Sequence, residues 1–294
     1  MDLRDLRYFE TIATLEHVGR AATRLHRTQP ALTSAVRRLE DECGAPLFER
    51  RGRGIRLTAT GQVLLRWAQR VRIDVDDALR EMAEIERGLS GVVRVGVVPT
   101  AAQFLLPPAT KRLLVEAPGA LLKTTVALVD VLRPMLQAGE LDLMIATETA
   151  PVVGFESTLL TEDAIVVAAH ADHEVLRGRP TMRTLGNYRW VLQPPGAPTR
   201  DWLDHTFDRY RLPRPQVQVE SSMLLTLPAL IADTGLLSFL SRHHVATRGR
   251  HNPLREVPLR QTTMMRRIVV SHRTHGYVSP LARRLVELLA ESVR

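Results

Sequence analysis

Apolar residues recur at spacings of three and four along the first part of the chain, which is the pattern of amphipathic helices. One such series runs through residues 3–13 and a second, shorter one through residues 19–26. A third helix follows, and its predicted buried stripe consists of Leu32, Ala35, Val36, Leu39 and Cys43. Three short helices of this kind predict a small helical domain over residues 1–58.

Polar side chains occupy the opposite face of the third helix. Thr28 stands at its start and is expected to cap it through the hydroxyl group. Pro30 suits the first turn because its missing N–H would be unpaired there. Gln29, Arg37 and Arg38 on this face can hydrogen-bond base edges in the major groove. The hydroxyl groups of Thr33 and Ser34 suit phosphate oxygens. The arrangement predicts a helix-turn-helix whose third helix contacts duplex DNA.

The arginines of this face could instead pair with the acids at 40–42, because most helical charge runs are solvated surfaces. The downstream sequence favours DNA, since residues 50–56, RRGRGIR, contain four arginines and no acid. A basic hairpin here is typical of the wing of a winged helix, which follows the sugar-phosphate backbone. Over residues 20–56 nine arginines stand against four acids, so the positive charge is concentrated here. The predicted DNA contacts are Thr28, Gln29, Pro30, Thr33, Ser34, Arg37, Arg38, Arg51 and Arg53.

A long amphipathic helix is predicted within residues 59–91. Its apolar stripe could pack on its own domain, but its length and its place between two domains favour an intermolecular coiled coil. Self-association is therefore predicted. The predicted dimer contacts are Leu64, Trp67, Val71, Val75, Met82 and Ile85.

Short apolar runs alternate with helical segments after residue 91, which predicts an α/β architecture with ligand sites at the carboxyl ends of strands. A last helix is expected after Ser279, which would cap it, with Pro280 in its first turn. The predicted strands span 92–98, 122–128, 141–147, 164–170, 190–193, 216–221, 236–241 and 266–272.

Composition narrows the class of protein. The chain has 294 residues and a net charge of +8, which suggests an anionic partner without separating nucleic acid from a merely basic surface. Cys43 is the single cysteine, so no intrachain disulfide is possible. The absence of a cleavable apolar signal and of a run of about 18 apolar residues predicts a cytoplasmic protein without a membrane segment. A free-standing solute-binding protein, the rival for residues 92–294, would need export.

Motifs of enzymes are missing from the sequence. It has no nucleophile elbow, phosphate-binding loop, dinucleotide fingerprint or H-E-x-x-H helix. Three histidine pairs lack cysteine or carboxylate partners at a metal-ligand spacing and are interpreted as exposed loop residues. We therefore expect no catalytic residue, no metal and no cofactor.

One family resemblance is specific. Residues 21–61, AATRLHRTQPALTSAVRRLEDECGAPLFERRGRGIRLTATG, resemble the N-terminal signature of LysR-type transcriptional regulators without a gap. The segments VRVGVVPTAAQFLLPP and MLQAGELDLMIAT also resemble the effector domain of that family. Glu16 and His17 replace the Gly-Ser pair that usually opens the second helix, and Ser34 stands where many relatives carry a larger basic or polar residue.

The resemblance implies a winged helix-turn-helix, a linker helix and a two-lobed effector domain similar to periplasmic solute-binding proteins. It places lobe I in 92–161 and 267–294 and lobe II in 162–266, with a small organic effector bound between them. It also implies paired linker helices, commonly tetramers on two half-sites of promoter DNA. Effector binding would then change DNA bending and the recruitment of RNA polymerase.

Candidate effector contacts lie after strand ends. Thr100 is either an effector contact or an ordinary helix cap, and the resemblance favours the former. Arg200 is interpreted as either a carboxylate ligand or a surface charge. Relatives usually place a glycine and then a small hydroxyl residue after the second strand, where this chain has Ala127, Leu128 and Val129. We therefore expect an effector less polar than, or seated differently from, simple dicarboxylates. The full candidate set is Thr100, Ala101, Leu128, Val129, Gln193, Gly196, Thr199, Arg200 and Ser222.

Overall fold

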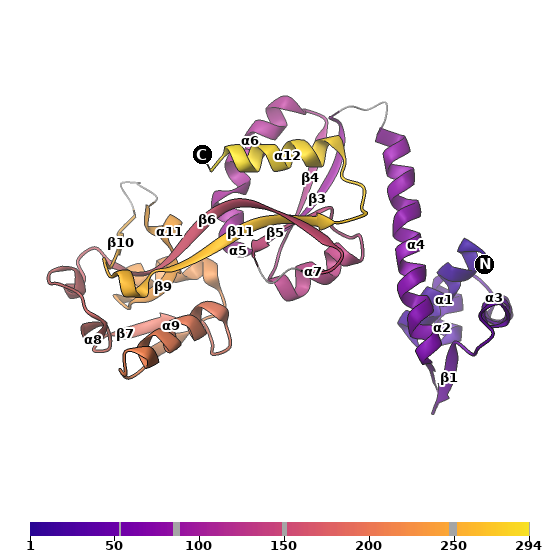
Figure 1. The fold of residues 1–294 in the computed structure, drawn as a ribbon, viewed down its shortest axis with the longest axis horizontal. Coiled ribbons are helices and arrows are strands. Elements are labelled where there is room, and N and C mark those ends of the chain that lie inside the picture. The colour runs from indigo at the N-terminus through magenta and orange to yellow at the C-terminus, as the bar shows by residue number, and fades with distance from the viewer. Residues whose placement is uncertain (53, 85–88, 149–151, 247–251, 294) are drawn as a thin grey trace. The chain divides into compact units, whose positions relative to one another are not determined.

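The computed structural model describes residues 1–52, 54–84, 89–148, 152–246 and 252–293 (Figure 1). It divides the chain into two compact units, Met1–Arg87 and Gly88–Arg294. The first unit contains helices α1 (Leu3–Leu15), α2 (Val18–Arg24), α3 (Gln29–Cys43) and α4 (Ala59–Glu84) and strands β1 (Phe48–Arg51) and β2 (Gly54–Leu57). β1 and β2 form an antiparallel hairpin, so the predicted winged helix-turn-helix is confirmed.

Local hydrogen bonds fix the ends of the short helices. Nδ1 of His17 accepts the N–H of Arg20 at 3.3 Å, so the histidine caps α2 where relatives have serine. Thr28 occupies the N-cap of α3, but its side chain accepts no hydrogen bond there, so the expected hydroxyl cap is wrong. Pro30 does lie in the first turn, and Gly44 ends the helix in the left-handed region at φ 65°.

The long helix begins against the base of the wing. The hydroxyl oxygen of Thr58 accepts the N–H of Gly61 at 3.0 Å. A Cβ atom at Gly61 would stand 2.1 Å from the carbonyl oxygen of Leu47, so this approach requires glycine. The first turns of α4 then complete the core with α1, α3 and the wing, where Leu64 and Ala68 are buried.

Lobe I of the second unit contains a parallel set of strands. β3 (Gly91–Val97) pairs in parallel with β4 (Ala120–Val126) on one side and β5 (Leu143–Thr147) on the other. The helices of this lobe are α5 (Pro99–Phe104), α6 (Leu106–Glu116), α7 (Val129–Gln137) and α12 (Pro280–Glu291). Ser279 Oγ accepts the N–H of Ala282 at 3.1 Å, so the predicted cap of the last helix is confirmed.

Lobe II has a smaller core around Trp190 and Phe207, both fully buried. Its strands are β7 (Arg189–Leu192), β8 (Gln216–Glu220), β9 (Ser238–Ser241) and β10 (Leu254–Glu256). Its α-helices are α8 (Met182–Leu185), α9 (Pro198–Arg209), α10 (Leu227–Thr234) and α11 (Arg242–Ala246). Three single 3₁₀ turns complete it: η1 (Glu174–Leu176), η2 (Leu224–Thr226) and η3 (Arg260–Thr262).

Two long antiparallel strands join the lobes. β6 (Phe155–His170) and β11 (Met264–Arg273) run side by side from one lobe into the other (Figure 1). The hydrophobic pattern predicted only the second half of β6, because residues 155–163 are mostly polar and exposed. Glu162 is opposite Arg267 in the register, so the two predicted crossings near 162 and 266 fall on neighbouring strands. The predicted α/β fold of the effector domain is confirmed.

Among the helices that the structure describes, none combines the length and the apolarity needed to cross a membrane.

Candidate DNA interface, subunit seam and effector region

The exposed face of α3 carries most of the predicted DNA contacts in one row. Its exposed members are Gln29, Pro30, Thr33, Ser34, Arg37 and Arg38. The hydroxyl of Thr33 donates to the carbonyl oxygen of Gln29 at 3.0 Å, so its oxygen remains as an acceptor. The opposite face, with Leu32 and Leu39, is fully buried. One side of α3 therefore holds the domain together while the other is presented to a partner.

Arg37 and Arg38 differ in their surroundings. Nε and Nη2 of Arg38 donate to the two carboxylate oxygens of Asp5 at 2.8 and 2.7 Å, and Asp5 is only 4% exposed. These hydrogen bonds lower the pKa of Asp5, against the opposing effect of burial. Within the described ranges, Arg37 forms no ion pair or side-chain hydrogen bond, and neither arginine pairs with the acids at 40–42. Arg38 is thus a structural residue first, and Arg37 is the cation available to DNA.

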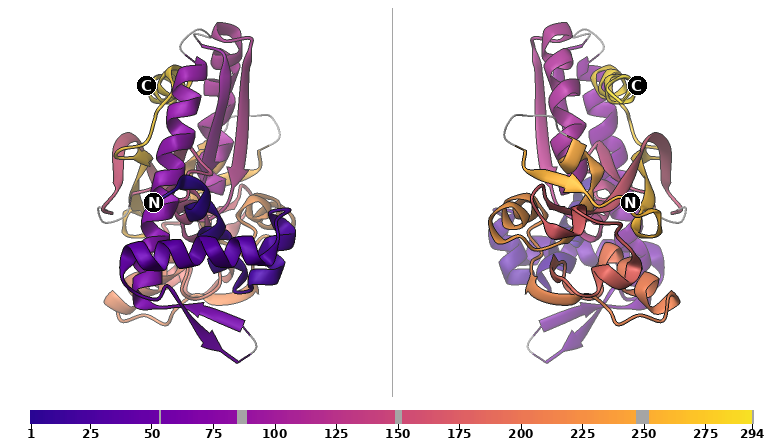
Figure 2. Two further views of the ribbon diagram at one scale, coloured as in Figure 1. Left: turned by 90° about the vertical axis from the view of Figure 1, so that its right-hand side faces the viewer. Right: turned by 90° about the vertical axis from the view of Figure 1, so that its left-hand side faces the viewer.

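The wing projects from the helices of the first unit (Figure 2). Its strands pair in register from Phe48 and Leu57 to Arg51 and Gly54. The N–H of Ile55 donates to the carbonyl oxygen of Glu16 at 3.3 Å, which fastens the hairpin to the end of α1. The wing's exposed cations include Arg50, Arg51 and Arg56, and Arg53 lies outside the described residues.

The first half of α4 packs on its own unit. Leu64 is 8% exposed and belongs to the core that α1, α3 and the wing share. Its assignment to a seam between subunits is therefore wrong, because the side chain is already covered within the chain. Val71 packs against the same core and is half-buried. The turns of α4 that carry Leu64 and Val71 therefore pack on their own domain, which was the alternative interpretation of the apolar stripe.

The second half of α4 leaves its apolar side chains exposed. The exposed fractions are 37% for Val75, 57% for Leu79 and 59% for Met82, and Trp67 nearer the start is 57% exposed. Leu79 was absent from the predicted seam. Ile85 lies outside the described residues. The described part of this half therefore presents apolar side chains that its own unit does not cover.

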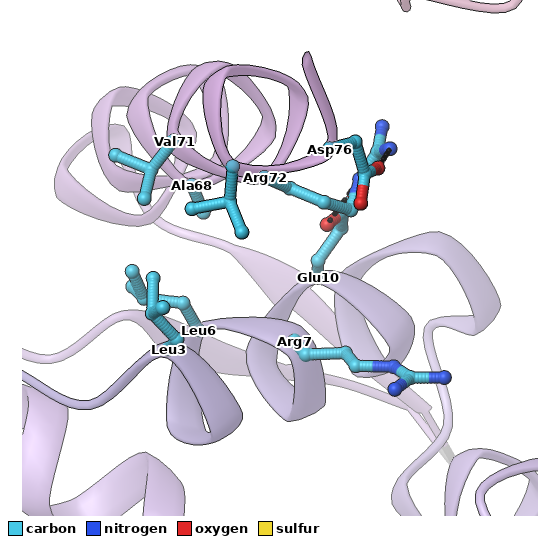
Figure 3. Close-up of a pocket in the computed structure, with 9 residues that line it drawn as sticks. Leu3, Leu6, Arg7, Glu10, Ala68, Val71, Arg72 and Asp76 are labelled. Atoms are coloured by element: carbon cyan, nitrogen blue, oxygen red, sulfur yellow. Dashed lines mark hydrogen bonds and ion pairs between the residues drawn. The ribbon is translucent and has the colours of Figure 1, made fainter. Parts of the chain in front are cut away.

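A groove of about 140 Å³ lies between α1 and α4 (Figure 3). Its apolar end is lined by Leu3, Leu6, Ala68 and Val71. Its polar end is held by Arg72, whose Nε and Nη1 atoms lie 3.3 Å from carboxylate oxygens of Glu10 and Asp76 respectively. Leu3 is 54% exposed, so the apolar end opens to the surface beside Val75.

The predicted effector contacts in lobe I differ in how exposed they are. Thr100 lies inside α5 and is 7% exposed, and Val98 is the N-cap, so the view of Thr100 as an ordinary cap is wrong. Ala101 is fully buried in the core of the lobe, so its side chain cannot touch an effector and that prediction is wrong. Leu128 is 55% exposed at the N-cap of α7, and Val129 lines a pocket within lobe I.

Arg200 in lobe II is buried and paired. Its Nε donates to a carboxylate oxygen of Asp204 at 2.9 Å, and its Nη1 donates to the carbonyl oxygen of Gln193 at 3.2 Å. The side chain is 9% exposed, so its interpretation as a surface charge is wrong. The nearer carboxylate belongs to the same helix, and that of Glu220 on β8 lies 3.9 Å from Nη1, so Arg200 holds the loop before α9 in place.

The other candidates of lobe II lie where β7 and β8 end. Thr199 donates its hydroxyl hydrogen to the side-chain oxygen of Gln193. Gly196 adopts φ 88°, and its N–H donates to Asp201 at 2.9 Å, so the loop has a fixed shape. Ser222 is exposed just after β8. Because β7 and β8 are parallel neighbours, these residues share one edge of lobe II.

Contacts near the lobe junction had no signal in the local sequence pattern. Phe104 of α5 stacks on His243 of α11, with ring centroids 3.8 Å apart and planes 10° from parallel. On the connecting strands, the buried carboxylate of Asp163 accepts from Arg266 at 2.6 Å and from Ser241 at 2.7 Å. The partners are far apart in sequence, so only the fold brings them together. Among the described residues, no three metal-ligating side chains gather into a possible metal site.

Together these features define a regulator in which a DNA-binding unit is joined to a ligand-binding α/β unit. Residues 3–62 match the model of the bacterial regulatory helix-turn-helix protein of the lysR family, and residues 86–294 match the LysR substrate binding domain. The chain belongs to the LysR family of transcriptional regulators, so it is a DNA-binding regulator with an effector-binding domain and not an enzyme.

Known proteins resemble the chain over its whole length. The transcriptional regulator GalR of Pseudomonas putida is 27% identical over 295 residues, covering 99% of this chain and 74% of GalR. The structure of a full-length OxyR variant from Pseudomonas aeruginosa matches with a TM-score of 0.69 and 28% identity, covering 100% of this chain and 95% of that one. CbnR complexed with its target DNA matches with a TM-score of 0.65 at 23% identity, covering 99% and 100%, and shares the fold.

Proposed function

We propose that the chain acts in the cytoplasm as a homodimer, and further as a tetramer, which reads a promoter site of dyad symmetry through α3 and the wing. An effector between lobes I and II would alter the angle between dimers, the bending of DNA and the recruitment of RNA polymerase. The observation that carries this proposal is the exposed Arg37, on a recognition helix whose other face is fully buried. A small organic effector is the only ligand proposed, with no metal or other cofactor.

The second half of α4 supports the dimer. Trp67, Val75, Leu79 and Met82 expose between 37 and 59% of their surface, and burying them in a second copy removes apolar area from water. The groove between α1 and α4 continues this surface at Val75, so a partner helix laid along α4 would also cover the groove.

An exposed apolar edge of lobe I supports a second interface, which a tetramer requires. β4 is the last strand in the order of the seven-stranded sheet, so its outer backbone groups are open to pairing. Its Leu121 and Val126 are each 50% exposed, and Val115 on α6 is 76% exposed. Two different surfaces on one chain suffice to build a closed assembly of four.

The effector proposal rests on the polar groups at the edge of lobe II and on the apolar residue at the start of α7 in lobe I. Leu128 is exposed where relatives place a hydroxyl residue, and this favours an effector with an apolar portion over a small dicarboxylate. The side chains of Gln193, Thr199 and Ser222 would supply its hydrogen bonds.

Thermal unfolding in the presence of candidate ligands tests the effector class. A ligand at about one hundred times its Kd raises the free energy of unfolding by about 2.7 kcal/mol. We expect acids with an apolar portion to raise the Tm of the full chain and succinate to leave it unchanged. Stabilisation by succinate alone would contradict the proposed class.

A further inference from the structure

Lobe II carries a large share of the positive charge of the chain. Residues 162–266 contain 14 arginines and 10 acids, which give a net charge of +4 out of the total of +8. Residues 1–87 contain 16 arginines and 14 acids, which give only +2, because acids of α1 and α4 offset the cations of α3 and the wing. The excess in lobe II is therefore not explained by the helix-turn-helix.

The acids of lobe II are paired with arginines in other parts of the lobe. These ion pairs join Arg200 to Asp204, Arg214 to Asp208, Arg242 to Glu256 and Arg266 to Asp163. Arg200 is also the arginine of the effector region, and its charge is already matched there. The unmatched charge of the lobe must lie elsewhere.

Residues 177–189, which we call the arginine segment, present unmatched cations. The run from residue 175 to residue 200 contains no acid. Four arginines of the segment are exposed, and none of them forms an ion pair among the described residues: Arg177, Arg179, Arg183 and Arg189. Only Arg177 forms a side-chain hydrogen bond there, to the carbonyl oxygen of Asp172 at 3.4 Å. The segment therefore offers guanidinium groups to an external anion.

The backbone beneath these cations is well packed. Met182 and Leu185 of α8 are buried in the core of lobe II. The indole N–H of Trp190 donates to the carbonyl oxygen of Leu185 at 3.2 Å, which joins α8 to the start of β7 (Figure 1). Arg183 follows a buried residue of α8, and Arg189 is the first residue of β7. The effector candidates follow the other end of β7, so the arginine segment is separate from them.

The composition of this surface fits phosphate groups better than a protein. A guanidinium donates two parallel hydrogen bonds to a phosphate. Among the described residues from 160 to 209, no large apolar side chain is exposed. The surface thus lacks the apolar anchor around which protein interfaces form. Duplex DNA, with one negative charge per roughly 1.7 Å, is the polyanion that this family of regulators binds.

We infer that the arginine segment of lobe II binds the sugar-phosphate backbone of DNA outside the site that α3 and the wing contact. This inference rests on DNA binding by the first unit and goes beyond it, because it gives the effector-binding domain a DNA contact of its own. Such contacts strengthen binding to any sequence, since phosphates carry no sequence information.

The dependence of DNA binding on salt tests this inference. The slope of log K against log salt concentration falls by about 0.9 for each phosphate contact that is lost. Fluorescence anisotropy of the full chain on its upstream intergenic DNA, at about 50 to 200 mM KCl, measures this slope. We expect Arg183→Gln with Arg189→Gln to reduce the slope by about one to two and to weaken binding at low salt by about tenfold. The loss should be equal on specific and random DNA.

Matched variants separate a local contact from the general effect of charge. Arg255→Gln with Arg260→Gln removes the same charge from exposed positions of lobe II outside the segment and should keep the wild-type slope. Arg183→Lys with Arg189→Lys keeps the charge and should keep most of the slope. Thermal unfolding checks that each variant folds. Should the double glutamine variant unfold, Arg179→Gln, in the loop before α8, should still reduce the slope by about 0.9.

An unchanged slope in the folded glutamine variants of the segment would overturn the inference. Equal reductions in the two double glutamine variants would also overturn it, because the effect would then belong to the net charge of the lobe. Unchanged DNA binding together with lost activation of transcription in vitro would mean that the segment binds a protein instead. In these three cases retardation of the promoter by the wild type would leave the proposed function standing. Absence of any DNA binding by the wild type would contradict the proposed function, and this inference with it.

Discussion

Arg37 and Arg38 are adjacent on α3, yet only Arg38 has a buried carboxylate beside it. The sequence pattern placed both arginines on the exposed face, and the acids at 40–42 were the partners that the local sequence offered. Asp5, the observed partner of Arg38, is 33 residues away, and no local periodicity reveals such a contact. Arg200 is a second case, because its burial depends on Asp204 and on how the loop after β7 folds back. The partners and the burial of single charged residues were therefore the features that the sequence predicted least well.

Substituting each arginine separately distinguishes recognition from structure. We expect Arg37→Ala to weaken promoter binding while leaving the Tm unchanged, because Arg37 has no partner among the described residues. Arg38→Ala should lower the Tm of the first unit by several degrees, since it leaves the carboxylate of Asp5 buried without its donor. Fluorescence anisotropy on specific and random DNA, together with thermal unfolding, measures both effects. Equal Tm losses in the two variants would refute this division.

The Asp5 carboxylate also predicts a dependence of stability on pH. Its pKa is lowered in the folded chain by the hydrogen bonds from Arg38, so its contribution is complete above the unfolded pKa of about 3.9 and is lost as the pH falls through the folded value. At neutral pH, Asp5→Asn should cost about 1–2 kcal/mol in the free energy of unfolding. The difference from wild type should shrink below about pH 4. A difference that stayed constant down to pH 3 in urea titrations would argue against the pair.

Individual helices and strands were predicted well where their pattern was strong. The three helices of the first unit, the wing and the capped last helix follow from periodicity and turn residues. β10 was missed because it has only three residues, and the first half of β6 because its side chains are mostly polar and exposed. The stripe of α4 was predicted as a single seam, but it faces its own core in the first turns and stays exposed later. Periodicity reveals that a face is apolar and does not reveal which partner covers it.

Substitutions in the two halves of α4 are expected to have different effects, one on the stability of the fold and the other on self-association. Leu64→Ala should lower the free energy of unfolding by about 2–4 kcal/mol, because it leaves a cavity in a core that the chain itself forms. Leu79→Glu should instead favour the monomer in sedimentation velocity, since Leu79 is 57% exposed. Its secondary structure by circular dichroism should be unchanged. If Leu79→Glu sedimented as the wild type does, α4 would not be the seam.

At the scale of the whole molecule, two compact units divide the tasks of a regulator. The first unit presents a cationic helix face and a wing, and the second holds two lobes joined by β6 and β11. The family resemblance of about 40 residues near the start predicted this organisation correctly. Details of the effector region were not predictable, because they depend on which side chains the packing of each lobe leaves exposed.

The most direct test is a titration of the full chain, and of its Arg37→Ala variant, against the intergenic DNA upstream of its own gene at low ionic strength. We expect retardation of this fragment at protein concentrations that leave random DNA of equal length free. We also expect Arg37→Ala to lose more affinity for the specific fragment than for random DNA, because a base contact carries sequence information and a phosphate contact does not. Absence of retardation, or undiminished binding by the variant, would contradict the assignment of α3 as the reading surface.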